Sequence, residues 1–234
     1  MTFDVILLSY SKTPEHRAIT EDCIKSLKKA KNKVKVNIIV LESYEEQNFK
    51  GVKNVFFKEN KFCYNQSMNE GFKHTSAPFV FFCNNDLIFS HGWADNCYQA
   101  FAMGYKSVSP YCPIASKRFT KSGDFLQVGY QVGFHITGWC IGIERETFKE
   151  LGGFNTAVDF WYSDNIYAEQ LKVANIKHAL VCNATVKHLD WGSKTLNSLK
   201  KVEKTYLTKG QALKYKKEVR RLWDAKGKAV LHKH

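Results

Sequence analysis

Short apolar runs alternate with segments of helical periodicity along the first half of the chain. The apolar runs predict four strands: residues 5–8, 34–41, 52–57 and the run that ends at Asn84. Apolar positions at helical spacing predict three helices: residues 14–30, 64–74 and 92–103. Thr13 is expected to cap the first helix, directly ahead of Pro14. This alternation predicts an α/β fold in which helices flank a single, mostly parallel central sheet.

The second half is less regular, because glycines divide residues 123–142 into short β-type segments. Helices are predicted at 147–151 and 164–174, ahead of closing strands at 178–182 and 184–188. After residue 193, apolar residues recur at helical spacing in two successive segments: Leu196, Leu199, Val202 and Tyr206, then Leu213, Val219, Leu222 and Trp223. We expect one domain over residues 1–193 and a basic helical extension, residues 194–234, packed on it.

The formal net charge of +13 is concentrated at the end of the chain. Residues 194–234 contain 13 Lys or Arg and three acids, so they supply 13 − 3 = +10 of that total. The segment favours an acidic partner, although solvated helix faces carry similar charge runs. Tyr206, Tyr215 and Trp223 are interleaved with the cations, where they are suited either to stacking on bases or to a core.

The seven cysteines are scattered and never spaced as CxxC, which argues against a disulfide framework and a structural zinc site. The apolar runs are far shorter than the roughly 18 residues that cross a bilayer. The first residues also lack a basic region ahead of an apolar one. We therefore expect a soluble, cytoplasmic chain with no transmembrane segment.

Two amides and one carboxylate follow the most apolar strand run: Asn84, Asn85 and Asp86. At the carboxyl edge of a parallel sheet, such side chains face the crevice where ligands bind. Their oxygen atoms suit a hard cation and a phosphate. The alternative is a simple turn, because Asn and Asp are common where strands end.

Four motifs, in family order within residues 3–193, resemble those of the inverting glycosyltransferases of family 2. They are residues 5–11, residues 38–42, residues 65–71 with 79–86, and residues 152–155 with 160–167. The resemblance implies the GT-A fold of nucleotide-diphospho-sugar transferases. Three positions depart from the family pattern. Glu42 stands where the family usually has Asp, and Asn84 and Ser163 each stand where the family usually has an acidic residue.

The resemblance implies a donor site, a metal site and a catalytic base. For the donor, expected to be a UDP-sugar, it implies nine residues: Ser9, Tyr10, Ser11, Glu42, Asn65, Asn69, Asn84, Asn85 and Asp86. It implies Asp86 and His188 as ligands of Mn²⁺ or Mg²⁺, and Asp164 as the general base for the acceptor hydroxyl. The alternatives are an ordinary strand-end histidine at 188 and helix capping by Ser163 or Asp164.

The acceptor is less explicit in the sequence. Gly138 and Trp139 fall where the family's acceptor loop lies, and the basic segment adds Lys194, Lys200 and Lys201 as candidate acceptor-binding residues. The preferred acceptor is a hydroxymethylated pyrimidine in DNA, as in some bacteriophage DNA-modifying glycosyltransferases, which implies the host cytoplasm. The alternatives are a surface polysaccharide, lipopolysaccharide or protein acceptor, and a catalytically inactive nucleic-acid-binding module.

Overall fold

The computed structural model describes residues 1–58, 61–113, 124–189 and 201–231, with side chains from 209 to 227 in the last segment. Nine strands form the sheet of this described part: β1 (Thr2–Ser9), β2 (Lys35–Glu42), β3 (Lys53–Phe56), β4 (Phe79–Asn84), β5 (Leu87–Phe89), β6 (Ser107–Tyr111), β7 (Leu126–Val128), β8 (Cys140–Glu144) and β9 (His178–His188). Their order is β3-β2-β1-β4-β8-β6-β9-β5, and β7 pairs with β9.

Six of these strands run in one direction. β3, β2, β1 and β4 are parallel neighbours, and β6 and β9 form a second parallel pair. β8 separates the two groups and is antiparallel to both β4 and β6, while β5 and β7 are antiparallel to β9. The predicted central sheet is confirmed, and each of its antiparallel pairings involves β8 or β9 from the second half of the chain.

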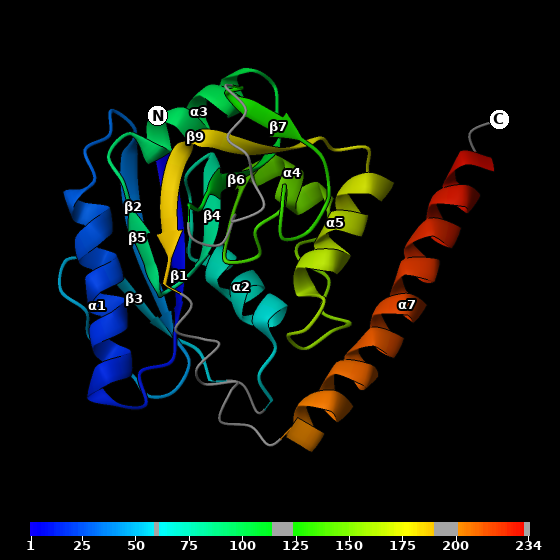
Figure 1. The fold of residues 1–234 in the computed structure, drawn as a ribbon, viewed down its shortest axis with the longest axis horizontal. Coiled ribbons are helices and arrows are strands. Elements are labelled where there is room, and N and C mark those ends of the chain that lie inside the picture. Colours follow the sequence, from blue (N-terminus) through cyan, green and yellow to red (C-terminus); the bar gives the residue numbers. More distant parts are fainter. Residues whose placement is uncertain (59–60, 114–123, 190–200, 232–234) are drawn as a thin grey trace.

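The described helices are α1 (Pro14–Lys29), α2 (Tyr64–Lys73), α3 (Trp93–Ala102), α4 (Arg145–Glu150), α5 (Ser163–Val173) and α7 (Lys201–Leu231). The first five cover both faces of the sheet (Figure 1). Strand side chains alternate between the faces, so Phe3 joins Trp93 in the cluster beneath α1 and α3. Ile6 instead joins Phe148 and Tyr167 in the cluster beneath α2, α4 and α5. Thr13 caps α1 as predicted, because its hydroxyl accepts a hydrogen bond from the His16 amide (3.3 Å).

Four elements differ from the sequence prediction, among them β6, which was not predicted. The two closing strands are one strand, β9, whose pairing with β6 shifts register between Pro110 and Tyr111. β5 was not predicted, because its three residues directly follow the polar turn after β4. The two C-terminal amphipathic segments belong to one helix, α7, because no proline interrupts residues 201–231. Leu196 and Leu199 lie outside the described residues.

α7 lies along α5, on the outer side of the layer that contains it (Figure 1). The Tyr215 ring stacks on Tyr162 with centroids 5.2 Å apart. The Trp223 indole N–H donates to Glu169 Oε2 (3.0 Å), and Glu218 Oε1 accepts from the Asn155 amide (2.7 Å). Tyr215 and Trp223 therefore help to attach α7 to the domain, which is closer to the second of the two roles suggested for them.

A buried histidine makes folding stability depend on pH. His178 is fully buried, and its ring nitrogens contact Ser107 Oγ (2.8 Å) and the His135 carbonyl (3.0 Å). Burial lowers the pKa of His178 from 6.5 to about 3. Between these values the unfolded chain binds a proton that the folded chain does not. As the pH is lowered below 6.5, the free energy of unfolding is therefore expected to decrease, with this group contributing up to ~1.4 kcal/mol per pH unit.

Urea unfolding at pH 7 and pH 5 measures this dependence. His178→Gln is expected to be less stable than the wild type at pH 7. Its free energy of unfolding should also depend less steeply on pH, because the contribution of His178 is gone. His74→Gln, at a half-buried histidine after α2, is the matched control and should keep the wild-type slope. An unchanged slope in His178→Gln would contradict the assignment.

Candidate functional site

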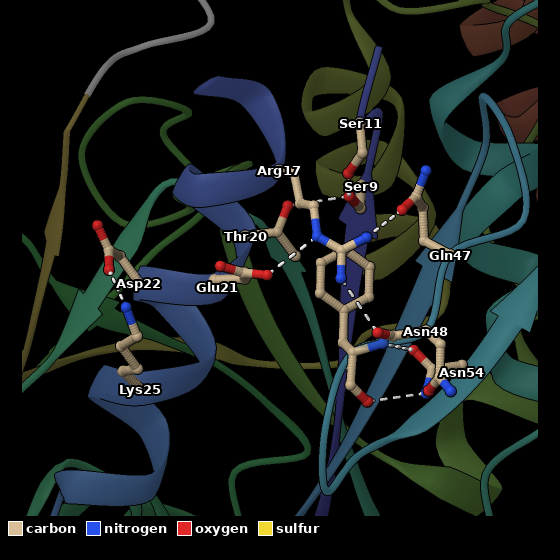
Figure 2. Close-up of polar contacts among 11 residues, drawn as sticks. Ser9, Ser11, Arg17, Thr20, Glu21, Asp22, Lys25, Gln47, Asn48 and Asn54 are labelled. Carbon is tan, nitrogen blue, oxygen red and sulfur yellow. Dashed lines mark hydrogen bonds and ion pairs between the residues drawn. The ribbon is translucent and has the colours of Figure 1, made fainter. Parts of the chain in front are cut away.

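The ends of three parallel strands bring the predicted donor residues to one edge of the sheet. Ser9 of β1 is in register with Glu42 of β2, and Leu8 is in register with Asn84 of β4. The Ser9 hydroxyl contacts the hydroxyls of Ser11 (3.0 Å) and Thr20 (2.9 Å), as Figure 2 shows. The strand ends and the start of α1 therefore form a polar corner at the carboxyl edge of the sheet.

Glu42 lies at the centre of this corner and is only 2% exposed. Its Oε1 accepts hydrogen bonds from three backbone amides, those of Ser11 (3.0 Å), Ser43 (3.1 Å) and Tyr44 (2.9 Å). Within the described residues, its Oε2 is buried and has no hydrogen-bond partner. Because buried polar atoms are normally paired, this oxygen indicates a position for a donor group of a ligand.

Arg17 holds the chain beside this corner, and sequence analysis did not identify it. Figure 2 shows its guanidinium bonded to Glu21 on α1, to Gln47 and to the Asn48 carbonyl (3.2 Å). It also lies over the Phe49 ring, 5.1 Å from the centroid. These contacts fix the connection between β2 and β3 against α1. Arg17 is hard to recognise from the sequence, because its partners Gln47 and Asn48 lie in a segment with no helical or strand periodicity.

The remaining predicted donor residues divide into two groups. Tyr10 is half exposed and meets the Tyr44 ring edge to face at 5.2 Å, so it remains open to a ligand. Asn85 lies at the corner, where its amide donates to Thr20 (2.8 Å). The amides of Asn65 and Asn69 instead donate to carbonyls of the loop before α5, at Asn155 (2.7 Å) and Phe154 (2.8 Å). Both therefore support a loop, a role that the sequence prediction of donor contact missed.

Asp86 and His188 meet across a pairing of distant strands. β5 and β9 are antiparallel with Leu87 opposite His188, and His188 Nε2 lies 3.2 Å from Asp86 Oδ1. Asp86 is only 5% exposed, which makes this a largely dehydrated pair. The His188 ring also stacks on Trp139, with centroids 5.6 Å apart and planes inclined by 17°.

This pair fits the implied divalent cation. A carboxylate oxygen and an imidazole nitrogen are suitable ligands for Mn²⁺, and the carboxylate alone suits Mg²⁺. No group of three or more His, Cys, Asp or Glu side chains that could hold a metal occurs among the described residues. The protein thus offers two donor side chains here, and phosphate oxygens and water suit the remaining coordination positions.

Asp164 stands in the first turn of α5, beside the loop that contains Gly138 and Trp139. A Cβ added at Gly138 would lie 2.9 Å from Asp164 Oδ2, so the glycine allows the carboxylate to approach the loop backbone. The Tyr64 hydroxyl donates to the Gly138 carbonyl (3.3 Å) and holds the loop from α2. Adjacent residues of one loop therefore contact Asp164, at Gly138, and His188, at Trp139.

The surroundings of Asp164 increase its proton affinity. Burial raises the pKa of Asp164 above 3.8, while a hydrogen bond from the Asn165 amide to Oδ1 (2.9 Å) acts in the opposite direction. The N-cap of α5 is Tyr162, which has φ 68° and makes no side-chain capping bond, although Asp164 Oδ1 satisfies one first-turn amide, that of Asn165. The suggested cap at Ser163 is therefore wrong, and Asp164 is left as a half-buried carboxylate beside the loop.

The predicted basic acceptor residues are only partly described. Lys194 and Lys200 lie outside the described residues, and Lys201 begins α7. The described part of α7 exposes six other cations, Lys209, Lys214, Lys216, Lys217, Arg220 and Arg221, of which Lys214 and Arg221 pair with Asp159 and Glu218. No helix in the described ranges is long and apolar enough to cross a membrane.

Neither models of protein families nor curated protein sequences match this chain. Solved structures do: PcManGT, a mannosyltransferase from Pyrobaculum calidifontis in complex with GDP-Man and Mn²⁺, has a TM-score of 0.58 and 14% identity over 79% of this chain and 56% of its own. GalNAc-T7 with UDP, GalNAc and Mn²⁺ has a TM-score of 0.61 and 12% identity, with 80% and 43% covered. S. aureus TarS (1–349) has a TM-score of 0.59 and 12% identity, with 80% and 59% covered.

The chain thus spans about half the length of these three structures. At this level of identity the likeness concerns the fold. Most of the chain superposes on glycosyltransferase structures, and the expected GT-A fold is confirmed.

Proposed function

We propose that this chain is a metal-dependent, inverting glycosyltransferase that moves a sugar from a nucleotide-diphosphate donor to an acceptor hydroxyl. The observation that carries the proposal is the loop at Gly138 and Trp139, where Gly138 adjoins Asp164 and Trp139 stacks on His188, the partner of Asp86. Sugar transfer requires charge neutralisation at the leaving diphosphate and a base at the attacking hydroxyl. The residues that adjoin this loop are of types suited to these tasks.

The donor, a UDP-sugar in our proposal, occupies the polar corner at the strand ends. Ser9, Ser11 and Glu42 face its nucleoside, and the unpaired Glu42 Oε2 accepts a hydrogen bond from it. Asp86 and His188 hold Mn²⁺ or Mg²⁺, which when bound stabilises the negative charge of the departing diphosphate. Asn84 replaces an acid at this edge, so we assign it a hydrogen bond to the donor.

Asp164 acts on the acceptor. Its carboxylate takes the proton of the acceptor hydroxyl while that oxygen attacks the anomeric carbon. The bond between the anomeric carbon and the diphosphate oxygen breaks on the opposite face, which inverts the configuration. Because burial raises the pKa of Asp164, its carboxylate binds this proton more tightly than an exposed aspartate does.

A screen of nucleotide sugars by thermal shift, with and without Mn²⁺, tests the donor side. A donor that stabilises the protein only when Mn²⁺ is present supports the proposal. Stabilisation by none of the nucleotide sugars would oppose it.

For the acceptor we propose DNA that bears a hydroxymethylated pyrimidine. The supporting observation is the outward face of α7, which exposes Lys209, Lys216, Lys217 and Arg220. Side-chain cations on a helix bind phosphates and release counterions, which gives affinity that weakens as salt rises. The target base must leave the helix stack to bring its hydroxymethyl group to Asp164.

Charge reversal on α7 tests the DNA acceptor. The triple variant Lys216→Glu/Lys217→Glu/Arg220→Glu is expected to weaken duplex DNA binding roughly tenfold or more at low salt and to flatten its salt dependence. Gel shifts at two salt concentrations measure both effects. The matched control, which reverses the same number of exposed lysines at the amino-terminal edge of the sheet, is Lys29→Glu/Lys33→Glu/Lys35→Glu. Equal losses in both variants, or no DNA binding by the wild type, would instead favour a glycan or protein acceptor.

A further inference from the structure

An exposed cluster of aromatic side chains lies beside the site and has no role in the account above. It consists of Phe62, which is 46% exposed, Phe160, 38%, and Trp161, 37%, and is termed the aromatic patch. The Phe160 centroid is 6.1 Å from that of Phe62 and 5.5 Å from that of Trp161. Large contiguous apolar surfaces are uncommon on soluble proteins and typically mark binding sites.

The aromatic patch is built from two loops that are distant in the sequence. Phe62 precedes α2, and the other two rings precede α5. The loops are joined by a hydrogen bond from the Tyr64 amide to the Asp159 carbonyl (2.8 Å). In Figure 1 both loops lie at the same end of the molecule as the amino-terminal half of α7.

The aromatic patch is coupled to the proposed base by direct contacts. Phe160 meets the Tyr64 ring edge to face at 6.4 Å, and Tyr64 in turn binds the Gly138 carbonyl. The Phe160 carbonyl accepts a hydrogen bond from the Ser163 amide (3.3 Å), at the residue before Asp164. An acceptor placed on these rings is therefore close to the start of α5.

Cations border the aromatic patch. Lys61 lies next to Phe62 and binds Asp159 Oδ2 (2.6 Å), and Lys214 of α7 reaches the same oxygen (3.4 Å). Burial tends to raise the pKa of Asp159, but hydrogen bonds from Lys61 and Gln211 hold that pKa below its usual range. Two lysines share one carboxylate, so a net positive charge remains beside the rings and continues along the outward face of α7.

We infer that the aromatic patch is a stacking platform for unpaired bases of a nucleic-acid strand, with the cations of Lys61, Lys214 and α7 on its phosphates. Exposed aromatic rings with a positively charged border are the combination that binds single strands without sequence preference. The inference rests on the proposed function, since it assigns the platform to the strand that presents the acceptor base to Asp164. The rings are inclined by 46° and 71° to their neighbours, so they offer faces to more than one base.

The test measures binding of a fluorescein-labelled 12-nucleotide oligothymidylate by anisotropy at several salt concentrations. Phe160→Ala/Trp161→Ala is expected to weaken binding roughly tenfold or more at each salt concentration, because stacking on the rings is lost. The slope of log Kd against log salt should remain that of the wild type, since the cations remain. Phe160→Tyr/Trp161→Phe should retain binding. The matched control is Met103→Ala, at a residue that is 62% exposed after α3, near the amino end of β6.

Two results would overturn the inference: affinity of Phe160→Ala/Trp161→Ala within twofold of the wild type, or no binding of the oligonucleotide by the wild type. Thermal stabilisation by UDP and Mn²⁺, measured on the same samples, shows whether the variant keeps its donor site. Loss of oligonucleotide binding with that stabilisation intact supports the platform. If the variants support the platform but no nucleotide sugar is ever consumed, the proposed function is wrong, whereas the assignment of the aromatic patch as a nucleic-acid-binding surface is retained.

Discussion

Replacement of Asp164 by asparagine is expected to lower the rate of sugar transfer by a factor of about 10² to 10⁴, the usual contribution of a general base. The amide has nearly the same shape as the carboxylate, so it fits beside Gly138, but it does not accept the hydroxyl proton. Donor affinity should stay nearly unchanged, because Asp164 meets the loop at Gly138, whereas His188 of the proposed metal pair meets it at Trp139. Release of nucleoside diphosphate in the presence of acceptor measures the rate, and calorimetry measures donor affinity.

The pH dependence of the same reaction gives a second readout. Transfer requires ionised Asp164, so the wild-type rate should fall as pH is lowered through its pKa, which burial raises above 3.8. The residual activity of Asp164→Asn should lack this acidic limb. Asp224→Asn, the same change on an exposed residue of α7, is the control and should behave as the wild type. An Asp164→Asn variant with more than half of the wild-type rate would exclude Asp164 as the base.

Replacement of Asp86 by alanine is expected to remove the effect of Mn²⁺ on donor binding. In the wild type, Mn²⁺ should strengthen UDP binding, because Asp86 and His188 would hold a cation that would neutralise the charge of the diphosphate. Without the carboxylate, one imidazole remains among the described donors at this position, so UDP should bind equally with and without Mn²⁺. Titration calorimetry with UDP, in the presence of Mn²⁺ and of EDTA, gives the two affinities directly.

Loss of stability is the competing explanation for an effect at a buried residue. Asp95→Ala separates the two, because Asp95 accepts hydrogen bonds from the backbone amides of Lys33 and Val34 before β2, at the opposite edge of the sheet. Asp95→Ala should lower the melting temperature and leave the Mn²⁺ effect intact. If Asp86→Ala keeps the full Mn²⁺ effect, the cation is bound elsewhere.

β1, β2 and β4 could be predicted because their apolar runs are buried on both sides of the sheet. β1, β2 and β4 are each found where a short apolar run was seen, within a few residues. β9 could not be recognised as one strand, because exposed Asn183 interrupts its buried pattern near the register shift against β6. β5 was missed because three residues after a polar turn have too little pattern of their own.

The site was predictable where its signal is local. Asp86 stands directly after an apolar strand, and its position at the carboxyl edge follows from the parallel sheet. The partnership of Asp86 with His188 depends on the pairing of β5 with β9, which no local pattern reveals. The aromatic patch could not be predicted for the same reason, since Phe62 and Phe160 belong to loops that meet only in the folded chain. The donor role of Asn65 and Asn69 was implied by the family resemblance and by no local pattern, and the side-chain amides of both residues donate to loop carbonyls.

The most direct test of the central claim is release of nucleoside diphosphate from a nucleotide sugar, followed with and without Mn²⁺ and with hydroxymethylated DNA as acceptor. The account predicts release by the wild type that requires the metal and the acceptor hydroxyl, and its loss in Asp86→Ala/Asp164→Asn. Equal release by that double variant, or no release from any nucleotide sugar with any acceptor, would contradict it.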